Sequence, residues 1–352
     1  MGKISRRDFL KIAAAGTEAM ALSALLDACG KMLTTSLPPR EQPAASLQSP
    51  NPESTSETAP ASSGTIQTTT ETTSDSTGTP LLPPDIVVTR GGEPEALVRQ
   101  AIAALGGMEK FIPRGANVVV KPNICVAYHT YEYAATTNPW VVGTLVKMCF
   151  EAGAASVKVM DYPFGGTQQE AYEISGIKEQ VEAAGGEMTN MLSYKYVTTQ
   201  IPTAKALKTT DVYEDILKAD VLINVPIAKQ HSSSRLTLGM KNLMGVIQNR
   251  GALHMNLGQS IADLNALIKP QLTVVDAVRI LTGNGPTGGD LADVMKLDTV
   301  IASQDIVAAD SYATSLFGMK PEDLDYIVIG TGMGLGRSDL QNLNIQVIQL
   351  DG

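Results

Sequence analysis

The chain has 352 residues, of which 27 are basic and 36 are acidic, giving a net charge of −9. This acidic balance argues against nucleic acid as a partner, because phosphate binding needs a basic surface. The three cysteines are too few to ligate an iron–sulfur cluster within this chain. We therefore expect no such cluster, and a divalent metal stays open as a cofactor.

The N-terminal segment resembles a twin-arginine export signal. Arg6 and Arg7 are followed by Phe-Leu-Lys, and an apolar stretch then runs from residue 12 to residue 26. That stretch is shorter than the roughly 20 residues that span a bilayer. Glu18 also interrupts it, which favours an export signal over a permanent membrane anchor. Residues 1–29 are therefore predicted to engage the twin-arginine export machinery, with a cytosolic amphipathic helix as the alternative.

A lipid attachment site is predicted at the end of this signal. The string Leu26-Asp27-Ala28-Cys29-Gly30 resembles a lipobox, although Asp27 departs from the pattern. Lipidation of Cys29 would tether the exported protein to the membrane surface, in the periplasm or at the cell surface. Signal cleavage nearby without acylation is the alternative.

A linker is predicted between this signal and the folded body. Residues 30–84 are rich in Ser, Thr, Pro, Glu and Gln and contain no Phe, Trp or Tyr. Such a segment cannot bury enough apolar surface to offset its chain entropy, so we expect it to be disordered. Residues 85–352 are long enough for one large domain with a substantial core.

Short β-branched runs alternate with helical patterns through the folded body. Strands are predicted at 86–88, 117–120, 156–160, 221–225, 272–275 and 299–302. Helices are predicted at 94–105, 139–152, 260–268 and 306–317. The strand segments are almost continuously apolar, which indicates that both faces of the sheet are covered. The alternation predicts an α/β fold with a mostly parallel sheet flanked by helices.

Polar residues follow four of the predicted strands. They are Lys121 and Asn123, then Asp161, then Lys229 and His231, and finally Asp276. In open α/β sheets, ligands bind at the carboxyl ends of the strands, so these side chains are expected to gather at one edge. A single Asp after a strand is often only a cap or a turn residue. The set as a whole favours a binding site.

A second candidate region runs from residue 229 to residue 254. Lys241 and Asn242 fall in an apolar helical pattern that contains Gly239 and Gly245. An unpaired charge in such a helix is costly, so Lys241 implies an anionic partner, either a protein carboxylate or a ligand. The alternative is that Lys241 extends to water. The two glycines would allow another backbone or a ligand to approach closely.

Several strings together resemble one protein family. They are Lys121-Pro122-Asn123, the predicted loop Lys229-Gln230-His231, the segment 239–245, His254 followed by 261–264, and the segment 274–277. In this order they resemble the domain of unknown function 362 (DUF362), over about residues 118–317. Many members carry ferredoxin-type cysteine motifs, which this chain lacks. The resemblance implies the fold and the site, and it implies no particular reaction.

The leading functional hypothesis is an exported enzyme that acts on a small anionic molecule. Its ligand-binding residues would be Lys121, Asn123, Lys241 and Asn242. Its catalytic residues would be His231, His254 and Lys229, since an imidazole titrates near neutrality. Asp161 and Asp276 would orient these groups or bind a divalent metal. The alternatives are a non-catalytic ligand- or cofactor-binding module and a subunit of a membrane-associated redox complex.

Two other features have simpler interpretations. The glycine-rich segment 330–336 is similar to a dinucleotide fingerprint, but too little chain follows it for the required crossover. A helix starting near Pro321 and ending in a glycine loop is expected instead. Cys125 and Cys149 lie in apolar contexts that favour small buried side chains, and a disulfide between them stays open.

Overall fold

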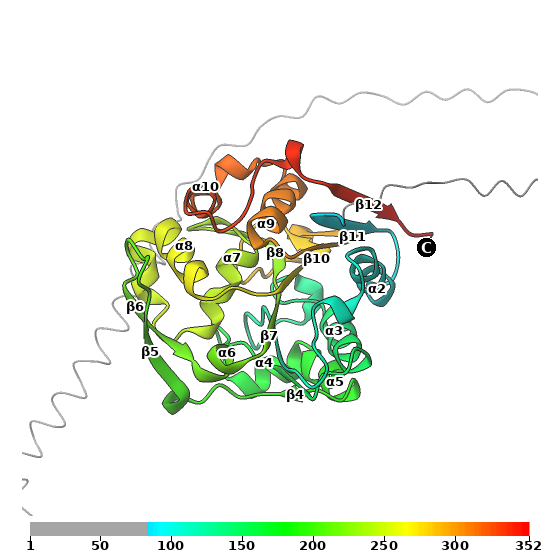
Figure 1. Ribbon diagram of the computed structural model, residues 1–352, viewed down its shortest axis with the longest axis horizontal. Helices are drawn as coiled ribbons and strands as arrows, with labels where there is room; N and C mark the ends of the chain where they lie inside the picture. Colours follow the sequence, from blue (N-terminus) through cyan, green and yellow to red (C-terminus); the bar gives the residue numbers. More distant parts are fainter. Residues whose placement is uncertain (1–82, 352) are drawn as a thin grey trace, which may run out of the picture. The chain divides into compact units, whose positions relative to one another are not determined.

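The computed structural model describes residues 83–351. The predicted twin-arginine signal, Cys29 and all of the predicted linker up to residue 82 lie outside this range. Within residues 83–351, no helix is long and apolar enough to cross a membrane. These residues form a single α/β domain, which confirms the fold class expected from the sequence (Figure 1).

The central sheet is mixed and mostly parallel. Its strands follow the order β12-β1-β11-β10-β7-β2-β3-β4, and β8 with β9 extends it beside β10. The antiparallel pairs in this sheet are β1 with β11, β10 with β11, and β8 with β9. The strands are β1 (Ile86–Arg90), β2 (Asn117–Pro122), β3 (Ser156–Val159), β4 (Glu187–Met188), β7 (Val221–Val225), β8 (Ile227–His231), β9 (Arg235–Thr237), β10 (Leu272–Leu281), β11 (Val294–Ser303) and β12 (Ile345–Gln349). A separate hairpin joins β5 (Tyr196–Gln200) to β6 (Thr209–Tyr213).

Helices cover both faces of the sheet. They are α2 (Pro94–Ala104), α3 (Pro139–Glu151), α4 (Gln168–Ile174), α5 (Ile177–Ala183), α6 (Glu214–Lys218), α7 (Gly239–Asn242), α8 (Leu257–Leu267), α9 (Ile306–Thr314) and α10 (Asp325–Gly332). Their ends follow local signals: α3 starts after Asn138, whose side chain accepts the Trp140 N–H, and α4 starts with a capping box at Thr167 and Glu170. The chain that leads into the glycine-rich segment forms the helix α10 and not a strand, as the sequence predicted.

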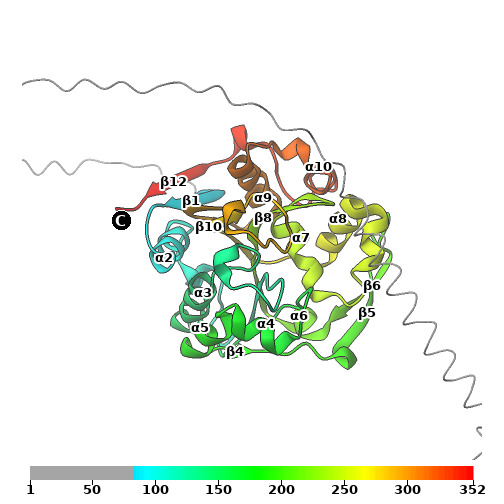
Figure 2. The same cartoon turned by 180° about the vertical axis from the view of Figure 1, so that it is seen from behind.

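Successive residues of each strand enter different hydrophobic cores. Val118 and Val120 of β2 pack in the core with α2, α3 and α5, whereas Val119 packs in the core with α7, α8, α9 and α10. Period-two alternation is what a strand between two helical layers requires. Figures 1 and 2 show these two groups of helices on opposite sides of the sheet.

The predicted loop at 229–231 is wrong, because these residues form the end of β8. Only Pro226 separates β8 from β7, and β8 continues beside the far half of β10, with Leu281 opposite Lys229. The long β10 therefore supplies a hydrogen-bonding partner beyond the end of β7. As a result, Lys229 and His231 lie on a rigid strand.

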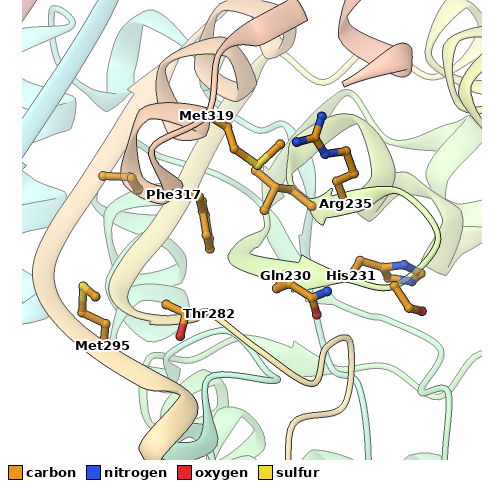
Figure 3. Close-up of a pocket in the computed structure, with 10 residues that line it drawn as sticks. Gln230, His231, Arg235, Thr282, Met295, Phe317 and Met319 are labelled. Atoms are coloured by element: carbon orange, nitrogen blue, oxygen red, sulfur yellow. The ribbon is translucent and has the colours of Figure 1, made fainter. Parts of the chain in front are cut away.

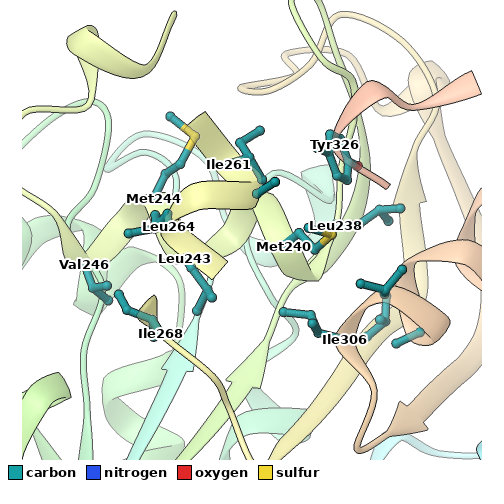
Figure 4. Packing of buried hydrophobic residues seen from close by; sticks show 14 of the residues in the cluster. Leu238, Met240, Leu243, Met244, Val246, Ile261, Leu264, Ile268, Ile306 and Tyr326 are labelled. Carbon is teal, nitrogen blue, oxygen red and sulfur yellow. The ribbon is translucent and has the colours of Figure 1, made fainter. Parts of the chain in front are cut away.

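The predicted apolar helix around Lys241 is much shorter than its pattern suggested. It consists of the four residues of α7, followed by a 3₁₀ turn over Leu243–Val246. Figure 4 shows why the segment is nonetheless well packed: Met240, Leu243 and Met244 lie against side chains of α8 and its C-terminal flank. The tertiary contacts, and not helix length, fix the position of Lys241.

Candidate functional site

Lys121 and Asp161 form a buried ion pair at the carboxyl ends of β2 and β3. Lys121 Nζ lies 2.9 Å from Asp161 Oδ1, and both side chains are almost completely buried. Asp161 Oδ2 also accepts the Ile124 N–H at 2.6 Å. Burial lowers the pKa of Lys121 to about 8, and the charge of Asp161 opposes that shift. The predicted metal residue Asp161 is therefore paired with a lysine.

Asparagine side chains link this pair to the neighbouring strands. Asn242 Oδ1 accepts hydrogen bonds from Lys121 Nζ at 2.7 Å and from Asn123 Nδ2 at 3.0 Å. Asn242 Nδ2 donates to Asn224 Oδ1 at 2.9 Å, and Asn224 Nδ2 donates to the Gly239 carbonyl at 3.0 Å. Three of the four predicted ligand-binding residues thus share one hydrogen-bonded network. The fourth, Lys241, precedes Asn242 in the chain and makes no hydrogen bond with this network.

Lys229 is buried without a carboxylate partner. Its ammonium donates to three neutral oxygens, which are Asn123 Oδ1 at 2.9 Å, the Ala135 carbonyl at 2.6 Å and the Pro286 carbonyl at 3.0 Å. All three donor positions of an ammonium are therefore used. The positive charge of Lys229 is solvated by dipoles and remains uncompensated. The fixed ammonium of Lys229 makes the electrostatic potential of the site positive. None of its N–H groups is free to donate to a substrate.

Lys241 is the least satisfied charged residue of the site. It is 8 % exposed, and it makes no hydrogen bond or ion pair with any residue between 83 and 351. Burial, together with the positive charges of Lys229, Arg250 and Lys121, lowers its pKa to about 7, whereas Cys125 opposes the shift. The side chain as a whole is buried, but its ammonium is not among the fully enclosed polar atoms that lack a partner, so water still reaches it.

Arg250 adds a fourth cation to this group. Its guanidinium stacks over the ring of Tyr162 at 5.1 Å and donates to the Pro163 carbonyl at 3.5 Å. We call Lys121, Lys229, Lys241 and Arg250 the basic cluster. Among the described residues, Asp161 is the one carboxylate paired with it. The basic cluster therefore carries excess positive charge inside an acidic protein.

The two predicted catalytic histidines lie near the basic cluster but differ in burial. His231 is 7 % exposed, and its Nδ1 accepts the Ser233 N–H at 3.0 Å, so Nε2 carries the proton of the neutral ring. Burial, together with the charges of Lys241, Lys229 and His254, lowers the pKa of His231 to about 3. His254 is exposed, and burial of part of its ring and the charge of Lys241 also lower its pKa.

Asp276 serves the scaffold of the site. Its carboxylate is fully buried and accepts the Asn138 N–H at 2.6 Å and the Val278 N–H at 3.0 Å, and burial raises its pKa to about 6. It therefore holds the start of α3 beside β10.

Within residues 83–351, no group of three or more His, Cys, Asp and Glu side chains is placed to hold a metal ion. The predicted metal role of Asp161 and Asp276 stays a prediction, and their observed contacts are with protein groups.

Two residues that sequence reasoning missed hold α7 in place. Asp310, buried on α9, accepts the Gly239 N–H at 2.6 Å and the Met240 N–H at 2.8 Å. Asn265, on α8, donates to the Met240 carbonyl at 2.9 Å. A carboxylate within the apolar run of α9 was the available signal, because a buried acid needs partners. Together they fix the backbone that carries Lys241.

Gly239 and Gly245 allow close approach, but the approaching groups are protein side chains and not the backbone or ligand expected from the sequence. A Cβ on Gly245 would lie 1.9 Å from Asp161 Oδ1 and 2.7 Å from Lys121 Nζ. A Cβ on Gly239 would lie 2.7 Å from Asp310 Oδ1 and 3.1 Å from Thr273 Cγ2. Both glycines therefore let buried charged groups sit against the backbone.

Gly239→Ala should destabilise the domain by about 1–3 kcal/mol, because a methyl group forced against a capping carboxylate overpacks the core. Urea unfolding followed by circular dichroism measures this change. Gly332→Ala is the matched control, since no atom lies within 4 Å of a Cβ at the end of α10 and alanine favours a helix there. Equal stability of both variants would contradict the packing that we describe for Gly239.

A pocket of about 480 Å³ opens beside this site. Figure 3 shows it between β8, β9 and the segment after α9. Its lining residues are Gln230, His231, Ser232, Arg235, Leu236, Thr282, Met295, Leu316, Phe317 and Met319. His231 belongs both to this wall and to the surroundings of Lys241. The pocket is largely apolar and contains no member of the basic cluster.

The fold and the candidate site lie within a segment that matches a known family. The family model for the domain of unknown function DUF362 matches residues 118–315, and the chain belongs to this family, as the sequence suggested. The match includes every predicted site residue from Lys121 to Asp276. The family name assigns no reaction.

The chain is similar to several known proteins. A thylakoid-associated protein of the cyanobacterium Synechocystis is 26 % identical over 249 residues, covering 68 % of this chain and 75 % of that protein. The lactate racemase apoprotein of Thermoanaerobacterium thermosaccharolyticum is 11 % identical, with a TM-score of 0.39, covering 60 % of this chain and 53 % of its own. A protein of Thermotoga maritima is 14 % identical, with a TM-score of 0.40, covering 64 % and 60 %. The chain thus spans less than two thirds of either solved structure.

Proposed function

We propose that this DUF362 domain binds a small anionic ligand against Lys241. The observation that carries the proposal is Lys241, whose side chain is largely buried, whose ammonium makes no hydrogen bond or ion pair with a described residue, and which lies among the positive charges of Lys229 and Arg250. Folding this arrangement without an anion costs free energy, whereas a bound carboxylate, sulfate or phosphate would compensate the charge.

The acid–base role is better suited to Lys241 than to the predicted His231. A general base works best when its pKa lies near the working pH. The pKa of His231 falls to about 3, whereas that of Lys241 falls to about 7. In an enzyme, Lys241 would therefore exchange the proton, and His231 would donate a hydrogen bond from Nε2. A purely ligand-binding module would use the same cations without that exchange.

Lys241→Met should abolish most of the stabilisation that anions give to the protein. A ligand at 100 times its Kd stabilises by about 2.7 kcal/mol, and loss of a charge-assisted hydrogen bond costs about 1.5–3 kcal/mol. Thermal unfolding of the full chain with phosphate, sulfate or oxalate, each compared with sodium chloride at equal ionic strength, measures the effect. We expect the anion-dependent rise in Tm to disappear in the variant.

Lys147→Met is the control for this experiment. Lys147 lies on α3 with its side chain 56 % exposed, so its replacement removes the same charge from the surface. Sulfate and phosphate stabilise many proteins by exclusion from their surface, and this general effect should persist in both variants. If Lys241→Met retains the wild-type response to all three anions, the proposed site is wrong.

We further propose that the protein works outside the cytoplasm at a membrane surface. Arg6, Arg7 and Cys29 support export by the twin-arginine route followed by lipid attachment. The thylakoid association named for the Synechocystis relative is consistent with a membrane location. Radiolabelled palmitate incorporation into the wild-type chain, compared with Cys29→Ser, tests the lipid. Equal labelling of the two, or none, would contradict this part of the proposal.

A further inference from the structure

Cys125 is placed beside the basic cluster by three loops. It follows β2, and its backbone N–H donates to Thr136 Oγ1 at 3.1 Å. Its carbonyl accepts the Phe164 N–H at 2.7 Å, and its sulfur donates to the Pro286 carbonyl at 3.4 Å. The side chain is 6 % exposed and forms no disulfide. The loops fix both the backbone and the thiol.

Two lysines lie close to this sulfur. The Pro286 carbonyl that accepts the thiol also accepts Lys229 Nζ at 3.0 Å, so the sulfur and this ammonium are no further apart than the sum of the two distances. Cys125 also affects the titration of Lys241, the unpaired lysine that points to an anionic ligand. The positive charges beside the sulfur attract reagents that carry an anionic group.

We propose that Cys125 is a nucleophile within the anion site and reacts with electrophiles that carry an anionic group. The inference rests on the proposed function, because the basic cluster must recruit the anionic group first. In the reaction, the sulfur attacks an electrophilic carbon, a new S–C bond forms, and the bond to the leaving group breaks. The thiol proton leaves with the departing group, which takes the electron pair of the broken bond, so Lys241 stays an ammonium that holds the anionic group.

Cys149 provides an internal reference for this reactivity. It is fully buried on α3, and burial alone raises its pKa to about 12. No lysine or arginine contributes to its titration. The two described cysteines therefore differ chiefly in the cations around them. A reagent that enters the folded protein should distinguish them.

The test is alkylation of the folded full chain at pH 7.5 with iodoacetate, which is anionic, and with iodoacetamide, which is neutral. Peptide mass mapping gives separate rates for Cys125, Cys149 and Cys29. Relative to free 2-mercaptoethanol, we expect the iodoacetate-to-iodoacetamide rate ratio at Cys125 to rise by about tenfold or more, as for a charge held near several cations at reduced dielectric. In Lys241→Met, this rate ratio at Cys125 should fall most of the way back to the value for free 2-mercaptoethanol.

The outcomes separate this inference from the proposed function. If Cys125 resists both reagents while phosphate still raises Tm through Lys241, the nucleophile is overturned and the anion site stands. If Cys125 reacts with both reagents in the ratio of the free thiol, and Lys241→Met changes nothing, the basic cluster recruits no anion and both proposals fail. Protection of Cys125 from iodoacetate by phosphate, lost in Lys241→Met, would support both.

Discussion

Asp161→Asn should lower the free energy of unfolding by about 3–5 kcal/mol, because removing one partner of a buried ion pair leaves an uncompensated buried charge. Lys121 would lose its one carboxylate while remaining enclosed by Asn242 and the start of the β2–α3 loop. The Ile124 N–H would also lose a charged acceptor. Few single substitutions in this domain should cost more.

Urea unfolding at pH 7 measures this change, and Glu173→Gln is the matched control. Glu173 lies 3.2 Å from Lys178 in an exposed ion pair, and such pairs contribute about 0–1 kcal/mol. A further variant, Lys121→Met with Asp161→Leu, removes both charges and should be more stable than Asp161→Asn. If Asp161→Asn costs no more than Glu173→Gln, the pair does not hold the strand ends together as the structure indicates.

The sheet could be predicted because helices cover both faces of its central strands. Runs such as 117–120 and 221–225 are continuously β-branched or apolar, and only a strand between two helical layers uses such a pattern at that length. The polar residues that follow such runs, Lys121 and Asp161 among them, are then expected at one edge of the sheet. Parallel strands place their carboxyl ends at the same edge, so this expectation requires no knowledge of tertiary contacts.

The partners of these residues could not be predicted in the same way. Asp161 pairs with Lys121 and Asp276 with the start of α3, although both follow strands in similar local sequence. The choice depends on which tertiary neighbour lies opposite each strand end. The sequence around Lys229 predicts a loop, because the strand β8 forms only by pairing with the far half of β10, about 50 residues later in the chain. Neither fact leaves a local signal.

The sequence predicted an apolar helix around Lys241, whereas a single turn held by Asp310 and Asn265 carries it. The anionic partner of Lys241 stays a prediction. Sequence reasoning left open whether a protein carboxylate pairs with this lysine. Within residues 83–351 none does, and that result turns an ordinary buried lysine into the centre of the proposed site.

Lys241→Met should stabilise the ligand-free protein, by about 2–4 kcal/mol at pH 7, since each unit of pKa shift corresponds to about 1.36 kcal/mol. In the folded protein the pKa of Lys241 is about 7, compared with 10.5 for an unperturbed lysine. Below pH 7 Lys241 is protonated in both the folded and the unfolded protein, so the folded protein carries the full cost of the buried charge. Between pH 7 and 10.5 the lysine is protonated chiefly in the unfolded protein, and the free energy of unfolding therefore rises with pH.

The advantage of Lys241→Met should therefore be greatest at or below pH 7 and should vanish toward pH 10.5, where the lysine is neutral in both states. Urea unfolding of wild type, Lys241→Met and Lys147→Met at several pH values measures this dependence. Lys147→Met, exposed on α3, should show a small difference that does not change with pH. A destabilised Lys241→Met at pH 7 would mean that the ammonium already has a compensating partner.

Saturating phosphate should then reverse the order of stability at pH 7. The wild type would gain the free energy of anion binding, whereas Lys241→Met would gain little beyond the general effect of the salt. A residue that destabilises the empty protein and stabilises the liganded one is retained for binding, because a methionine would serve the fold better. The reversal distinguishes a functional lysine from a structural one without any knowledge of the reaction.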